Sequence, residues 1–116
     1  MTPDAPSAAP SRRPVANLTL HRLERALRER VRYRYVRPQV LQEGEAFRIR
    51  SPNCSRRLDP KGGLIDIALL VPQGKLQWCL CARDHAGERW VPRLQDAPLK
   101  SALEALCLDP ERQFWP

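Results

Sequence analysis

Residues 21–37 contain the residue types best suited to binding an anion. They hold seven arginines and two glutamates, a net charge of +5 in a chain whose total is +7. Guanidinium groups neutralise phosphates or bind carboxylates, and tyrosine rings stack on nucleic-acid bases. The stretch therefore predicts a site for an anionic partner, with nucleic acid the first candidate. Its candidate residues are Arg28, Arg30, Arg32, Tyr33, Arg34, Tyr35 and Arg37.

Two other interpretations of this stretch stay open. An arginine-rich helix face is often only a solvated face, and a tyrosine beside it often belongs to the core. An acidic protein is a second partner that would suit the same guanidinium groups.

The four cysteines lack the spacing of a metal site. Structural zinc sites usually take two ligands from a C-x(2–4)-C turn, whereas Cys79 and Cys81 are separated by one residue in a predicted strand. Their Cα atoms should lie about 6.6–7 Å apart, too far for an easy disulfide. We therefore expect separate reduced thiols at Cys54, Cys79, Cys81 and Cys107, with no metal and no cofactor.

No catalytic motif is recognisable. His21 lies among arginines and His85 in a turn, and Gly62-Gly63 lacks the helix and lysine that a phosphate loop needs. Catalytic triads assemble in space rather than in sequence, so catalysis stays open. The sequence nevertheless favours a non-enzymatic role, and no catalytic residue is assigned.

The chain is long enough for one domain. It has 116 residues and no apolar run that approaches the length of a membrane span. Its N-terminus shows no signal-peptide pattern, which favours the cytoplasm. Residues 1–16 are rich in proline and small residues and are expected to be a disordered arm. Residues 17–116 are expected to form a single α+β domain.

Periodicity predicts two helices and a sheet. A helix should begin near residues 17–19, because Leu20, Leu23, Leu27 and Val31 recur at three- and four-residue steps. Alternation predicts a hairpin over residues 47–58 and strands over 64–71 and 76–83, with another strand after His85-Ala86-Gly87. A second helix should begin after Pro98 and end at Asp109-Pro110, and Phe114 and Trp115 should then fold back onto the sheet.

The turns predict a register for the sheet. A two-residue loop at Gln73-Gly74 would place Leu69 opposite Trp78 and Ile67 opposite Leu80. A three-residue loop ending at Gly87 would place Trp90 opposite Ala82. Both tryptophans would then lie on one buried face.

The predicted fold is an antiparallel β-meander of four to five strands, with an N-terminal and a C-terminal helix packed on one face. The other face mixes apolar and charged residues. We expect it either to be covered by residues 33–41 or to bind a partner protein, a second copy of the chain included. A protein-interaction or homodimerisation module is thus the alternative function.

The C-terminal half resembles a family of short bacterial proteins of unknown function. The resemblance rests on two tryptophans flanking a glycine turn, followed by a leucine-rich helix that ends in Asp-Pro and Phe-Trp. The matching residues are Trp78, Leu80, Gly87, Trp90, Leu99, Leu103, Leu106, Asp109, Pro110, Phe114 and Trp115. The resemblance implies this architecture and no activity.

Overall fold

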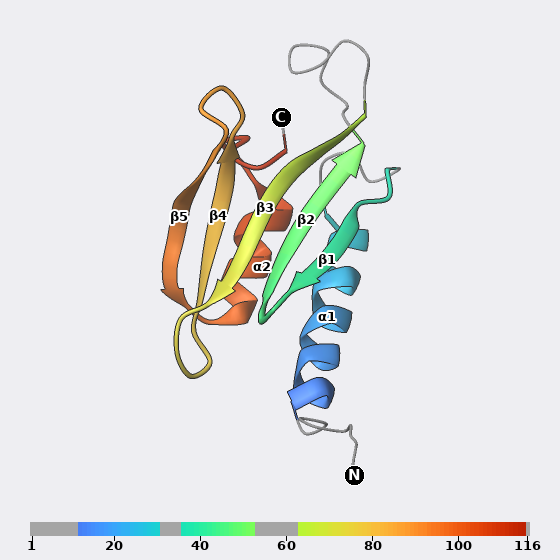
Figure 1. The fold of residues 1–116 in the computed structure, drawn as a ribbon, viewed down its shortest axis with the longest axis vertical. Helices are drawn as coiled ribbons and strands as arrows, with labels where there is room; N and C mark the ends of the chain where they lie inside the picture. The colour runs from blue at the N-terminus through green and yellow to red at the C-terminus, as the bar shows by residue number, and fades with distance from the viewer. Residues whose placement is uncertain (1–11, 31–35, 53–62, 116) are drawn as a thin grey trace.

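The chain folds into a five-stranded antiparallel sheet and two helices, which confirms the predicted α+β class (Figure 1). The computed structural model describes residues 12–30, 36–52 and 63–115, and the side chains of residues 18–30, 36–52 and 63–115. The strands lie in the order of the sequence. The elements are α1 (Arg12–Arg28), β1 (Gln39–Glu43), β2 (Ala46–Pro52), β3 (Leu64–Pro72), β4 (Trp78–Asp84), β5 (Arg89–Ala97) and α2 (Leu99–Leu108).

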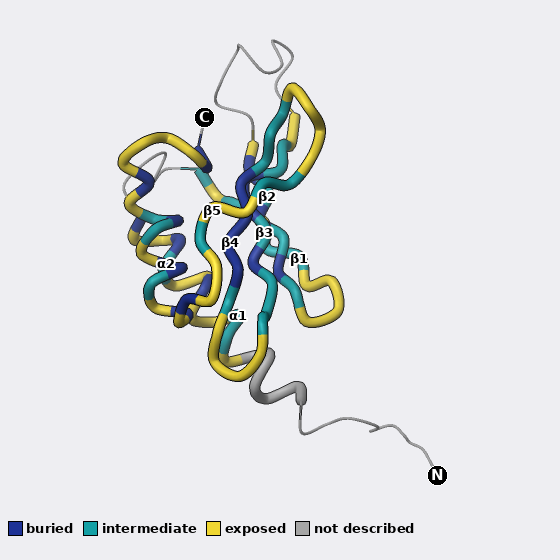
Figure 2. Tube along the Cα trace, turned by 90° about the vertical axis from the view of Figure 1, so that its left-hand side faces the viewer, coloured by how far each residue is buried: buried dark blue, intermediate teal, exposed yellow. Residues whose placement is uncertain are grey.

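Both helices pack on one side of the sheet, as predicted, and we call that side the covered face. Alternate strand residues point into it because successive side chains of a strand lie on opposite sides. The leucines of α1 and the apolar stripe of α2 bury these strand residues, and Figure 2 shows α2 beside the buried strand segments. The covered face consists of Phe47, Ile49, Ile67, Ala68, Leu70, Leu80 and Ala82, packed against Leu23, Leu27, Ala102, Leu103 and Leu106.

Helix α1 begins earlier than predicted. Its first residue is Arg12, so residues 12–16, expected in the disordered arm, are helical, and residues 1–11 lie outside the described residues. Proline at position 14 is compatible with this start, because the N–H groups of a first helical turn have no partner within the helix. The predicted leucine stripe is confirmed at Leu23 and Leu27, which are buried.

The first strand of the hairpin predicted over residues 47–58 is part of β2, and its returning strand, residues 54–58, lies outside the described residues. Strand β2 pairs with β1 on one side and β3 on the other, so both of its edges are occupied. Residues 39–41, suggested as a cover for the second sheet face, instead form part of the edge strand β1. Gly44 begins the two-residue connection between Glu43 and Ala46 with a φ of 65°, a conformation that suits glycine.

The register predicted between β3 and β4 is also wrong. The connection covers residues 73–77 rather than two residues, and it places Leu70 opposite Leu80 and Leu69 opposite Cys81. The Gln73 N–H donates to the Gln77 carbonyl at 2.9 Å and closes this longer loop. The pairing is shifted by three positions, an odd number, so Leu69 lies on the sheet face opposite to the one predicted.

A bulge in β3 allows Ile67 to be buried in the observed register. The pairing of β2 with β3 shifts between Ile49 and Arg50, which leaves Ile67 as an extra residue beside Ala68. Ile67 and Ala68 are both buried in the covered face. Asp66 is consequently placed on the opposite face, where it forms ion pairs with arginines.

The prediction that both tryptophans share one face is wrong as well. Residues 85–88 connect β4 to β5, one residue more than predicted, so Trp90 lies opposite Arg83 rather than Ala82. The Asp84 carboxylate accepts the Gly87 N–H at 3.1 Å and organises the longer turn. Trp78 packs beside Phe47 on the covered face, while Trp90 lies on the other face.

The C-terminal residues fold back into the core, as predicted. Phe114 and Trp115 are buried. The Asp109 carboxylate accepts the N–H groups of Gln113, Phe114 and Trp115 at 2.6, 3.1 and 2.8 Å. The Trp115 indole donates to the Leu106 carbonyl at 2.9 Å. Asp109 therefore ends α2 and also fixes the chain that follows.

Candidate functional site

The predicted arginine-rich segment does not form one exposed group in the described residues. Arg28 and Arg37 are exposed, but only 1% of Arg30 is accessible to solvent. Residues 32–35, with Arg32, Tyr33, Arg34 and Tyr35, lie outside the described residues. The described candidate residues are therefore two surface arginines and one buried one.

Arg30 is held by the fold itself. Its two terminal nitrogens donate to the carbonyls of Leu27 and Val36, each at 2.6 Å. Its guanidinium lies 4.5 Å from the ring centroid of Trp115, a cation–π contact in a buried setting. The side chain thus links the end of α1 to the chain before β1 and to the C-terminus. We assign it a structural role.

A different group of arginines lies on the sheet face away from the helices, which we call the open face. Arg48 and Arg50 alternate in β2 with the buried Phe47 and Ile49, so their side chains must point to the open face. The same alternation directs Arg83 of β4 there, because Ala82 is buried. The open face consists of Leu41, Glu43, Arg48, Arg50, Asp66, Leu69, Val71, Cys79, Cys81, Arg83 and Trp90.

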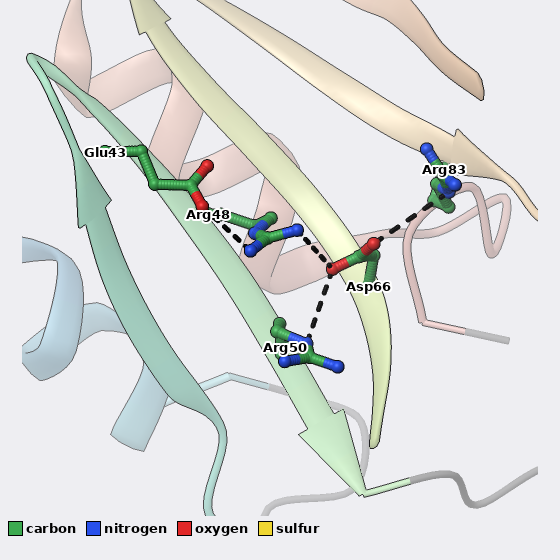
Figure 3. Close-up of polar contacts among 5 residues, drawn as sticks. All are labelled: Glu43, Arg48, Arg50, Asp66 and Arg83. Carbon is green, nitrogen blue, oxygen red and sulfur yellow. Dashed lines mark ion pairs between the residues drawn. The ribbon is translucent and has the colours of Figure 1, made fainter. Parts of the chain in front are cut away.

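Three guanidinium groups surround Asp66 on this face (Figure 3). Arg48 Nη1 lies 3.7 Å and Arg50 Nε 3.5 Å from Asp66 Oδ1, and Arg83 Nε lies 4.0 Å from Oδ2. Arg48 Nη2 also pairs with Glu43 at 2.8 Å. The three contacts to Asp66 are longer than ordinary charge-assisted hydrogen bonds. Asp66 therefore holds the arginines near one another without binding any of them tightly.

The charges of this group do not balance. Three arginines face two carboxylates, Glu43 and Asp66, which leaves a net charge of +1. Arg48 Nε and Arg50 Nε are buried at the atomic level and have no hydrogen-bond partner. Buried donors normally have one. The arginine side chains as a whole are partly exposed, 30% for Arg48, 32% for Arg50 and 22% for Arg83, so an incoming anion could contact their exposed atoms.

Trp90 and His85 border the same group. The Arg83 guanidinium lies 5.1 Å from the ring centroid of Trp90. Burial and the positive charge of Arg83 lower the pKa of His85, while the carboxylates of Asp66 and Asp84 act against that shift. Asp84 has its own pKa lowered, first by the Gly87 N–H and then by Arg89. The charge of Arg83, one member of the arginine group, therefore lowers the pKa of His85.

The cysteines in the described residues are free thiols at Cys79, Cys81 and Cys107, and Cys54 lies outside those residues. Cys81 lies opposite Leu69, whereas the predicted register, with Leu69 opposite Trp78, would have placed Cys81 opposite Asp66. Across residues 12–30, 36–52 and 63–115, no group of three or more histidine, cysteine and acidic side chains could hold a metal ion. Neither described helix is long and apolar enough to span a membrane.

Sequence reasoning missed the open-face arginines. The alternation of arginine with buried residues in β2 was visible, but its partners in β3 and β4 depend on the bulge at Ile67 and on two loop lengths. The available signal was the pattern of Arg48, Arg50 and Arg83 on strands that each also carry buried residues.

The fold and this surface define a small α+β domain that exposes arginines on an otherwise half-apolar sheet. The chain belongs to a family described as Domain of unknown function (DUF3024), whose model matches residues 10–116. The predicted membership in a family of unknown function is thus confirmed. The chain matches no curated protein and no solved structure.

Proposed function

We propose that the chain is a non-enzymatic binding module whose open face binds an anionic partner, with single-stranded nucleic acid the first candidate. The observation that carries this proposal is the group of three partly exposed arginines around one carboxylate, Asp66, which none of them approaches closer than 3.5 Å. A phosphate oxygen is an acceptor of suitable charge for guanidinium donors. The proposal thus moves the binding surface from residues 22–37 to the sheet.

Electrostatics and stacking both favour a nucleic acid. The chain carries a net charge of +7, which would draw a polyanion from a distance. Trp90 lies beside Arg83 at the border of the group, where a base could stack on a partly exposed ring. Basic sheet faces with aromatic side chains bind single strands with little sequence preference. The free thiols suit the cytoplasm, which we retain as the proposed compartment.

The test compares two sets of arginines that carry equal charge. One variant is Arg48→Gln/Arg50→Gln/Arg83→Gln. The matched control is Arg22→Gln/Arg25→Gln/Arg28→Gln, three exposed residues of α1. Fluorescence anisotropy would measure the affinity of each protein for a labelled single strand of about 12 nucleotides.

Wild type should show a log–log salt slope of about −2, because three phosphate contacts contribute roughly −0.7 each. Between about 50 and 200 mM salt the affinity should therefore fall roughly 20-fold. The open-face variant should lose most of this binding, and the helix control should keep it. If only the helix control lost affinity for the single strand, the binding site would lie in residues 22–37. Binding that does not depend on salt would contradict an electrostatic mechanism.

The alternative is a protein-interaction or homodimerisation module on the same face. Leu69 and Val71 are partly exposed there and would suit an apolar contact. In a homodimer formed through this face, however, the two positively charged groups would repel each other. Light scattering that shows a dimer, lost on Leu69→Lys, would favour this alternative over the nucleic-acid proposal.

A further inference from the structure

The two edges of the sheet differ in how readily they can accept a further strand. Strand β5 is a poor template, because Pro92 lacks an N–H, the pairing with β4 shifts in two places and Asp96 has a left-handed φ of 53°. Strand β1 contains no proline, no lysine and no bulge. Among the described residues, no segment pairs with the outer edge of β1. This edge is therefore the one open to strand addition.

The hairpin turn determines which backbone groups of β1 face outward. The two-residue connection makes Glu43 and Ala46 a hydrogen-bonded pair. Such pairs alternate along an antiparallel ladder, so Leu41 also bonds to β2. The N–H and C=O groups of Val40 and Gln42 consequently point away from the sheet. A strand that joined this edge would bond to those groups.

The side chains of β1 define the sequence that an added strand would need. Leu41 is half-buried on the open face, and the exposed residues Gln39 and Glu43 flank it there. Arg50 lies opposite Gln39 in β2, and the exposed Arg37 precedes Gln39 by two residues. An apolar residue beside Leu41 and an acidic residue beside Gln39 would therefore complement the edge.

We propose that the outer edge of β1 binds an extended, acidic segment of another protein by strand addition. The segment runs antiparallel to β1, the slightly more stable arrangement, so its apolar and acidic residues follow the order leucine-x-glutamate. Main-chain hydrogen bonds supply the affinity and alternate side chains the specificity. The net charge of +7 favours an acidic segment over a second copy of the chain. The inference stands independently of nucleic-acid binding at the open face.

The experiment follows the backbone amide resonances of ¹⁵N-labelled full-length protein while a capped peptide is added. The peptide is about ten residues long, alternates threonine with valine and carries Leu-Thr-Glu at its centre. Two N-methylated versions are matched controls. Methyl groups on the threonines beside leucine block N–H groups that face β1, whereas methyl groups on leucine and glutamate block N–H groups that face away.

The amide resonances of Val40 and Gln42 should shift progressively and saturate, while that of Arg93 in β5 stays in place. Methylation of the two threonines should abolish these shifts, and methylation of leucine and glutamate should preserve them. A lysine in place of the glutamate should weaken binding several-fold, because it would lie beside Arg50 and Arg37.

A protein variant tests the same hydrogen bonds from the other side. Val40→Pro removes an outward N–H and leaves the ladder to β2 in place. Peptide affinity should fall roughly tenfold, which corresponds to one main-chain hydrogen bond. Val40→Thr keeps the N–H and should bind as wild type does. Far-ultraviolet circular dichroism would show that each variant folds.

Three results would overturn the proposal. The first is no shift with the unmethylated peptide, or shifts along β5 instead of β1. The second is equal binding of the two N-methylated peptides, a test that needs only wild-type protein and so holds even if Val40→Pro does not fold. The third is a dimer in light scattering that becomes a monomer in Val40→Pro, because a second copy would then occupy the edge.

Discussion

Arginines on the two sides of the sheet differ in how closely the protein itself binds their guanidinium groups. On the covered side, Arg30 donates to two carbonyls at 2.6 Å and lies against Trp115. On the open face, Arg48, Arg50 and Arg83 approach Asp66 only to 3.5–4.0 Å. A guanidinium whose terminal nitrogens bond to carbonyls of its own protein contributes to folding. One that is held loosely near an exposed surface keeps donors for a partner.

The same contrast applies to the tryptophans. Trp115 is fully buried, its N–H bonded to the Leu106 carbonyl. Trp90 is half-buried and contacts Arg83 on the open face. We therefore expect substitutions on the covered side to change stability and substitutions on the open face to change binding.

The largest effect is expected for Trp115→Ala. It removes a fully buried ring, and the free energy of unfolding should fall by about 3–5 kcal/mol. Trp90→Ala should cost less than about 1 kcal/mol, the size of an exposed cation–π contact. Urea denaturation measures both, and equal losses would contradict the comparison. If Trp115→Ala does not fold, Trp115→Phe should still lose about 1–3 kcal/mol, because the Leu106 carbonyl loses its donor.

Asp109→Asn should have the next largest effect. The carboxylate accepts three backbone N–H groups, and an amide in its place turns one acceptor into a donor. The free energy of unfolding should fall by about 1–3 kcal/mol. Glu104→Gln on the exposed side of α2 is the control and should change stability by less than about 0.5 kcal/mol. A neutral Asp109→Asn would show that the C-terminus is not held by this carboxylate.

Asp66→Asn separates stability from binding on the open face. Its ion pairs are long and partly exposed, so the loss of stability should be at most about 1 kcal/mol. Single-strand affinity should increase several-fold, because the net charge of the group rises from +1 to +2 and the arginines lose a competing anion. Anisotropy at constant salt measures the change. Weaker binding would mean that Asp66 contacts the partner or positions the arginines for it.

The smallest effect is a pH dependence at His85. Its pKa is lowered in the folded state by burial and Arg83, so the folded protein favours the neutral ring. The resulting contribution to stability is complete above the ordinary pKa of 6.5 and is lost as pH falls through that value toward the lower folded pKa. His85→Gln should remove this dependence in urea denaturation at several pH values.

Binding of the anion should also depend on the protonation of His85, but the affinity should rise as the pH falls, whereas the stability should fall. An anion beside Arg83 would reduce the field that disfavours the charged imidazole, while Asp66 and Asp84 remain nearby. Affinity should therefore increase from about pH 7.5 to about pH 5.5 in wild type and less so in His85→Gln. A pH-independent affinity would place the bound anion away from Arg83.

Sequence patterns predicted the elements that depend on local periodicity. The leucine stripe of α1, the C-terminal helix with its stop at Asp109, and the return of Phe114 and Trp115 all follow from short-range spacing and burial of apolar rings. Each requires only neighbours within a few turns of the chain.

The errors arose where an odd number of extra residues reverses a face. The loop at residues 73–77, the turn organised by Asp84 and the bulge at Ile67 each change the side on which later residues lie. Trp90 was therefore assigned to the wrong face, and the arginines around Asp66 were not recognised as one group. Burial of Arg30 was equally hidden, because one partner, Trp115, comes from the C-terminus and the other, Val36, lies six residues on, beyond the end of α1.

One spectrum tests the central claim, that the open face and not the covered side binds the anion. The three tryptophan indole N–H resonances of ¹⁵N-labelled protein would be followed while an unlabelled single strand is added at low salt. We predict that the resonance of Trp90 shifts progressively and saturates, while those of Trp78 and Trp115 stay in place. A bound strand that leaves Trp90 unmoved, or that shifts Trp115 instead, would contradict the account.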